Sequence, residues 1–251
     1  MMSPIYTDKY DGSRIDYGAQ YGQTLNVTFT FIKDDYSDIS MTEQRNILKW
    51  LGGYKKNSWL TLYDYDYGEI CQLYGRFINI QAKTADSKVI GYIGEFECPT
   101  PFAYSPLREV EQIYTGKQQL TLENESDAED IYVYPIVTIT PMNGPINELH
   151  LFNKDIQETT VFKNIKADEI ITIDSSNKIV CANNEYRYIG TDFSGLYGEN
   201  EEYTSIAPVW PKLQPGDNRF IIDPCNNTAQ VKYNFKYRYP MKIGTVIDGV
   251  I

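Results

Sequence analysis

The second half of the chain is a series of short, β-branched and aromatic runs that are separated by turn signals. The runs that predict strands lie at 118–122, 132–140, 148–152, 159–162, 169–174, 178–181, 219–222 and 230–238. Turn sequences such as "MNGP", "SSN" and "QPGDN" lie between them, and helical periodicity is absent from this half. Short strands at near-regular spacing are typical of an antiparallel β-sandwich. We therefore expect a C-terminal sandwich domain over 106–251.

The first half predicts a small α+β domain over 1–105, so the whole chain is expected to be mainly β. Residues 25–32 alternate between apolar and polar side chains, which indicates a half-buried strand. Two more strand signals lie at 72–81 and 88–98, and Pro99 and Pro101 end the second of them. The first 24 residues are polar and rich in turn formers, and we expect a segment that is mobile or that a partner orders.

One short helix is expected before residue 53. Ser40 and Glu43 stand in capping-box register, and Gly52 with Gly53 predicts a left-handed stop. The helix should be about three turns long. Its apolar residues fall near one face and are Met41, Ile47, Leu48 and Leu51.

Two charged segments are expected to connect elements of the fold. The sequence "YDYDYGE" at 63–69 resembles a calcium loop only loosely, and we expect a hairpin turn whose tyrosines pack on neighbouring strands. The segment "SPLREVEQIYTG" at 105–116 reads as an exposed crossing between the domains.

Composition excludes several classes of function. A net charge of −11 over 251 residues opposes sequence-independent binding to nucleic acid, which requires Lys and Arg. The 22 tyrosines favour strands and contact surfaces. The start of the sequence lacks a signal-peptide pattern, and no run is long enough to insert into a membrane, so we expect synthesis in the cytoplasm.

The reactive side chains form no recognisable catalytic, cofactor or metal motif. Cys71, Cys98, Cys181 and Cys225 lack C-x-x-C spacing, and we expect four free thiols in or near the core. The single histidine, His150, lies in the strand "NELHLF", which favours a structural role and leaves a zinc site short of ligands. No phosphate loop, dinucleotide fingerprint or catalytic triad can be assembled, so we expect no enzyme and no cofactor.

Several motifs resemble the distal tail protein family of long-tailed phages (siphophages). In the first half these are a helix with "WL" near its end, "LTLYD", "GRF" and "FECPTPFAY". In the second half they are "IYVYPIVTIT", "EIITIDSSNKIVCAN" and "PVWPKLQPGDNRFIID" followed by "AQVKYNFKYRYP". The resemblance covers about 25–244. It departs from the family in having few residues before "DGS" and in a long loop at 183–210.

The resemblance implies a structural protein of the virion tail. It implies a homo-hexameric ring whose N-terminal domains face the tail tube protein and let DNA pass through the ring. It also implies galectin-like C-terminal domains that dock a tail-tip or tail-associated protein, and that could carry a receptor-binding protein.

Two groups of residues are candidate sites. The resemblance places the seam between the domains at Phe96, Cys98, Pro101 and Phe102. In the long loop, Tyr197, Tyr203 and Trp210 are candidates for contact with a peripheral partner or a glycan. A carbohydrate-binding, lectin-like module for host attachment is the alternative function, and an anchor between the loop and the sandwich is the alternative role of Trp210.

Overall fold

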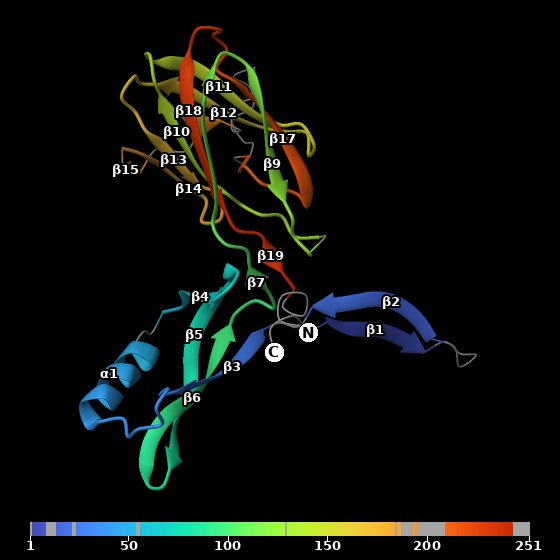
Figure 1. The fold of residues 1–251 in the computed structure, drawn as a ribbon. Helices are drawn as coiled ribbons and strands as arrows, with labels where there is room; N and C mark the ends of the chain where they lie inside the picture. The colour runs from blue at the N-terminus through green and yellow to red at the C-terminus, as the bar shows by residue number, and fades with distance from the viewer. Residues whose placement is uncertain are drawn as a thin grey trace. The chain divides into compact units, whose positions relative to one another are not determined.

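The computed structural model describes residues 2–8, 14–21, 24–53, 56–128, 130–183, 185–186, 193–194 and 209–242. These residues are mainly β, with one helix among them, as the sequence predicts (Figure 1). The chain divides into two compact units. Unit 1 comprises Met1–Tyr104 and Met241–Ile251, and unit 2 comprises Ser105–Pro240. Among the described residues, Met241 therefore belongs with unit 1, and the predicted domains of 1–105 and 106–251 stay a prediction.

Unit 1 is built on an antiparallel sheet with the order β19-β7-β5-β6-β3, and β4 also pairs with β5. Its strands are β3 (Leu25–Ile32), β4 (Ser58–Asp64), β5 (Gly68–Ala85), β6 (Lys88–Cys98), β7 (Ala103–Tyr104) and β19 (Pro240–Met241). The long strand β5 pairs with β4 through its first half and with β6 through its second half. The first 24 residues, which we expected to be mobile or ordered by a partner, contain β1 (Met2–Asp8) and β2 (Arg14–Tyr21), which form a two-stranded sheet.

The core of unit 1 is small. Its buried cluster consists of Cys71, Leu73, Phe96, Cys98 and Ala103. Around this cluster the apolar side chains of β3 and β4 are only partly buried. A group of aromatic rings, which includes Phe29, Phe77 and Trp50, continues from the core to the surface. The sheet of unit 1 is therefore incompletely covered by the unit's own side chains.

The helix α1 (Met41–Gly52) begins as the sequence predicts. The Ser40 side chain accepts a hydrogen bond from the backbone of Glu43, and the Glu43 carboxylate accepts one from the Ser40 backbone, so the capping box is complete. The predicted apolar face is only partly correct. Leu51 is buried and Ile47 is half-buried, whereas Met41 and Leu48 are 80% and 42% exposed.

The predicted left-handed end of α1 is wrong. Gly53 has φ −74° and ψ −17°, which is right-handed helical geometry. Its N–H donates to the Lys49 carbonyl at 3.0 Å, and a Cβ on Gly53 would lie 2.1 Å from that same oxygen. Glycine is therefore required here by close approach and not by a positive φ.

Unit 2 contains two antiparallel sheets, with the orders β15-β14-β13-β10-β18-β8 and β16-β12-β11-β17-β9 (Figure 1). The strands of the first are β8 (Arg108–Thr115), β10 (Ile136–Pro141), β13 (Ile171–Asp174), β14 (Ile179–Ala182), β15 (Glu185–Tyr186) and β18 (Gln230–Tyr237). Those of the second are β9 (Gln118–Asn124), β11 (Ile146–Asn153), β12 (Glu158–Ile165), β16 (Phe193–Ser194) and β17 (Gly216–Asp223). The predicted sandwich is thus confirmed.

The two sheets of unit 2 bury a continuous apolar core. Buried and accessible side chains alternate along β17 and β18, as expected for strands with one face on a core. Phe220 of β17 and Phe235 of β18, both fully buried, bring their ring centroids to 5.5 Å from each other. The two sheets therefore pack on each other through aromatic side chains of β17 and β18.

Two turns of unit 2 form for the reasons that the sequence indicates. Asp174 accepts hydrogen bonds from the backbone and side-chain amides of Asn177 at 3.0 and 2.7 Å. In "QPGDN", Gly216 has φ +88°, and the buried Asn218 bonds to the backbone of Gln214 in both directions. The buried Asn153 donates to Asn218 and to the Lys212 carbonyl, which fastens this segment to β11.

The segment that we expected to be an exposed crossing is strand β8. It forms an edge of its sheet and pairs with β18 over its whole length. Its charges are satisfied across the strands, because Glu109 pairs with Lys236 at 3.1 Å and Glu111 with Lys232 at 2.8 Å. The predicted exposure is correct, because most side chains of β8 are accessible, but the strand was missed because its carboxylates have their partners more than a hundred residues away.

Candidate assembly surface

Among the described side chains of unit 1, the most exposed aromatic ones lie on the hairpin formed by β4 and β5. The turn "YDYDYG" closes it, and the Asp64 carboxylate accepts hydrogen bonds from the backbone amides of Asp66 and Tyr67. Tyr63, Tyr65 and Tyr67 are 74%, 103% and 85% exposed. The hairpin is as predicted, but its tyrosines do not pack on neighbouring strands. Contact with another surface would remove these rings from water and lower the free energy.

A cluster of rings lies on the same hairpin. The ring of Trp59 lies 4.9 Å from that of Tyr74, its cross-strand neighbour, and 5.3 Å from that of Tyr104 on β7. Trp59 and Tyr74 are 43% and 36% exposed. The Tyr104 hydroxyl is held by Thr100 at 3.1 Å, and burial raises its pKa. We call the exposed rings of this hairpin and the adjoining Tyr104 the aromatic surface; they are Trp59, Tyr63, Tyr65, Tyr67, Tyr74 and Tyr104.

An apolar groove of about 450 Å³ lies between α1 and the β3–β6 edge of the sheet. Phe31, Trp50 and Tyr92 contribute its aromatic lining, and Ile47 and Leu51 contribute from the helix. Trp50 is 57% exposed although its ring lies 6.3 Å from that of Phe31. The groove and the aromatic surface together make unit 1 rich in accessible apolar area.

The residues predicted for the domain seam lie in or next to the core of unit 1. Phe96 and Cys98 are buried within it, Phe102 is 5% exposed, and Pro101 is half-buried. Burial raises the pKa of the Cys98 thiol to about 11. A role of these residues in contact between the units stays a prediction.

Of the residues predicted for a peripheral contact, only Trp210 is among the described residues; Tyr197 and Tyr203 lie outside them. Trp210 is half-buried in a segment that is tied to the sandwich. The Val209 carbonyl accepts a hydrogen bond from Thr160 at 2.9 Å, and Lys212 forms an ion pair with Glu158 at 2.8 Å. These contacts agree with the anchoring role, whereas contact with a glycan stays a prediction.

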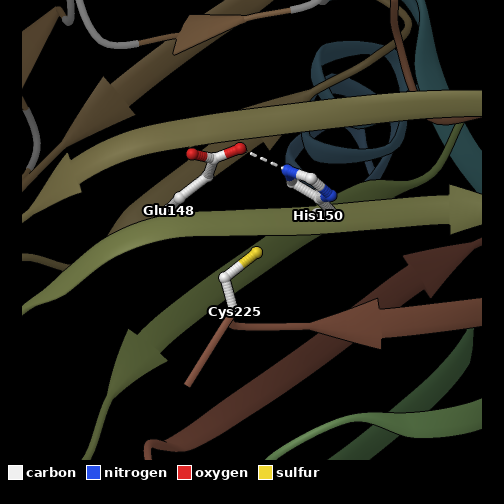
Figure 2. Close-up of side chains that lie close together, drawn as sticks. All are labelled: Glu148, His150 and Cys225. Atoms are coloured by element: carbon white, nitrogen blue, oxygen red, sulfur yellow. Dashed lines mark hydrogen bonds and ion pairs between the residues drawn. The ribbon is translucent and has the colours of Figure 1, made fainter. Parts of the chain in front are cut away.

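A second group of side chains was not anticipated from the sequence. Glu148 and His150 project from β11, and Cys225 lies just after β17 (Figure 2). One donor atom from each of the three lies within 4.8 Å of those of the other two. Cys225 is exposed, so the expectation of four thiols in or near the core is wrong for this residue. The alternation in "ELH" indicates a shared face for Glu148 and His150, but only the pairing of β11 with β17 brings Cys225 to them.

Comparison with protein families identifies the chain. A family model described as a phage tail protein N-terminal domain matches residues 6–100, and one described as a phage tail C-terminal domain matches residues 102–199. The chain belongs to this family of phage tail proteins. A phage tail protein is a component of the virion tail, so the localisation predicted from the motifs is confirmed, as is the resemblance to tail proteins.

Two solved structures share the fold of this phage tail protein. The Dit protein of phage SPP1, described as a paradigm of hub adsorption apparatus in phages that infect Gram-positive bacteria, has a TM-score of 0.60 at 12% identity. That match covers 95% of this chain and 88% of the SPP1 protein. A chain of the phage P2 baseplate, in its activated conformation with calcium, has a TM-score of 0.50 at 12% identity. That match covers 94% of this chain and 86% of the P2 chain.

The comparison with curated proteins adds nothing to the assignment, because none of them matches the sequence significantly. Among the described residues no helix is long and apolar enough to cross a membrane.

Proposed function

We propose that this phage tail protein is the distal hub of the tail, which joins the tail tube to the tail-tip and receptor-binding apparatus. The observation that carries the proposal is the aromatic surface, because a hub acts through contacts and this surface is accessible on the described unit 1. The fold shared with the SPP1 hub protein supports the same role. In this proposal the protein assembles and catalyses no reaction.

The hub is a homo-hexameric ring. Closed rings use the same contact at every interface, so modest contacts between subunits add up to a stable assembly. Unit 1 faces the tail tube protein and forms the ring, and unit 2 docks the tail-tip or tail-associated protein and, through it, a receptor-binding protein. The net charge of −11 suits a ring through which DNA passes without being held.

The assembly state of the purified chain tests the ring. Light scattering over a range of concentrations, with negative-stain images of the same samples, should show a mass of six chains and a closed ring. A chain that stays monomeric both alone and with tail tube protein would contradict the proposed hub.

A pair of matched variants tests the aromatic surface. Replacing Trp59 and Tyr74 together by Ser should lower the fraction of hexamer, because the two rings make one exposed cluster. Tyr134→Ser is the control, since Tyr134 is comparably exposed at 41% but belongs to unit 2. If the double variant assembles like the unmodified chain, the ring is closed by another surface.

A further inference from the structure

We propose that Glu148, His150 and Cys225 bind a zinc ion on the outer face of unit 2. The three residues offer one carboxylate oxygen, one imidazole nitrogen and one thiol sulfur, and these atoms lie within 4.8 Å of one another (Figure 2). The inference is independent of the proposed hub function, because it rests on side chains of unit 2 alone.

The strand β11 fixes two of the three ligands. Glu148 and His150 are two residues apart, so their side chains leave the sheet on the same side. The alternate residues Leu149 and Leu151 point to the opposite side and are buried in the core. Glu148 Oε1 lies 2.5 Å from His150 Nε2. This hydrogen bond keeps the carboxylate and the imidazole side by side before any ion is present, and binding an ion through both atoms would replace the hydrogen bond and release its proton.

The neighbouring strand positions the third ligand. His150 is the cross-strand partner of Asp223, the last residue of β17, and Cys225 follows two positions later. Cys225 has φ +53°, and its N–H donates to the Asp223 carboxylate at 2.9 Å. The resulting turn directs the sulfur toward Glu148 and His150 (Figure 2).

Asp223 is held outside the ligand set. Its other carboxylate oxygen forms an ion pair with Lys117 Nζ at 2.9 Å. It therefore acts as a positioning residue that fixes the turn, and the fourth coordination position of the ion is left to water.

The donor set favours zinc and related transition-metal ions over calcium and magnesium. Cys, His and Glu are the residues that bind Zn²⁺, at about 2.0–2.3 Å. Calcium and magnesium prefer oxygen ligands only. Glu148 and His150 are half-exposed and Cys225 is exposed, so an ion can reach the site and small side-chain rotations can close the ligands around it. The bound ion would tie β11 to the connection between β17 and β18.

Calorimetric titration of the full chain with zinc chloride, after removal of metals and in the presence of a non-thiol reductant, tests the proposal. One ion per chain should bind. Cys225→Ser and His150→Gln should each weaken binding by more than about 100-fold, since loss of a residue that only supports a ligand already costs 10–100-fold. Cys181→Ser is the matched control, because Cys181 is a partly accessible thiol on β14 outside the cluster, and it should bind like the unmodified chain.

Cobalt provides a second measurement that does not depend on affinity alone. Co²⁺ bound at this site should show thiolate-to-metal absorption that disappears in Cys225→Ser and persists in Cys181→Ser. Metal-free circular dichroism of each variant should match that of the unmodified chain, which excludes misfolding as the cause of lost binding. Zinc binding that is unchanged in Cys225→Ser, or cobalt binding without a thiolate band, would overturn the proposal.

Discussion

The two units of the chain use their apolar residues in different ways. In unit 2 two sheets enclose a core between them, where large side chains such as Phe220 and Phe235 are almost completely removed from water. In unit 1 the larger sheet is covered in part by a 12-residue helix, and rings such as Trp50 and Trp59 stay accessible. Unit 2 therefore has a closed core between two sheets, whereas the larger sheet of unit 1 is only partly covered. If the proposed assembly uses the rings of unit 1, substitutions there should change assembly more than stability.

The tryptophans allow the two units to be followed separately. Trp50 and Trp59 belong to unit 1 and Trp210 to unit 2. Urea unfolding recorded by fluorescence, in chains that keep only one set of tryptophans, therefore reports the free energy of unfolding of one unit at a time. Each prediction of stability below uses this measurement.

The largest effect is expected from Phe220→Ala in the closed core of unit 2. The side chain is 1% exposed, and its removal should lower the free energy of unfolding of unit 2 by about 4 kcal/mol. Phe220→Leu keeps most of the volume and should cost about 1 kcal/mol. A similar small loss for both variants would mean that the core of unit 2 is not tightly packed.

A smaller effect is expected from Phe96→Ala in unit 1. Phe96 is also 1% exposed, but the apolar side chains around it are only partly buried and can move into the space that it leaves. The loss should be about 3 kcal/mol, at the low end for a buried phenylalanine. A loss larger than that of Phe220→Ala would show that unit 1 is packed as rigidly as unit 2, which would contradict the difference in packing between the two units.

Asn218→Ala tests how much the buried side-chain hydrogen bonds contribute to the stability of unit 2. The substitution leaves the backbone N–H of Gln214 without its side-chain partner and removes one acceptor of the buried Asn153 amide, whereas the Gln214 carbonyl keeps its bond from Asn124. Unit 2 should lose about 2 kcal/mol. Asn177→Ala removes one side-chain bond to Asp174 in an exposed turn and keeps the backbone bond, so it should cost less, and equal effects would contradict the role of burial.

The smallest effect on stability is expected from Trp59→Ser. Trp59 is 43% exposed and its main contacts are the rings of Tyr74 and Tyr104, so the isolated chain should lose about 1 kcal/mol or less. The same substitution should reduce assembly much more than Tyr134→Ser does. A large loss of stability without a change in assembly would place Trp59 in the core of unit 1.

The sequence predicts those features of the fold that depend on neighbours along the chain. Alternation identifies β3, the Ser40 capping box starts α1, and "QPGDN" forms its turn around Asn218. Features that depend on distant partners were missed. Glu109 and Glu111 resemble a linker until Lys232 and Lys236 are placed beside them.

The same limit applies to the sites. The excess of tyrosine indicates contact surfaces, but only the structure shows that the rings of the β4–β5 turn point into water. Cys225 resembles a core thiol until strand pairing brings it to His150. Exposure and cross-strand proximity are properties of the folded chain, and local sequence patterns do not contain them.

The position of β17 and β18 within unit 2 has a consequence for the order of folding. Each lies inside its sheet, with β18 between β10 and β8 and β17 between β11 and β9. Both follow β8 to β16 in the sequence, so on the ribosome the earlier strands of unit 2 emerge before these partners exist. The two sheets can close only after residue 237 has been synthesised, and until then their unpaired strands are open to aggregation. A ribosome that stalls before residue 216 would therefore release a chain without either strand, and such a product should depend on chaperones or be degraded.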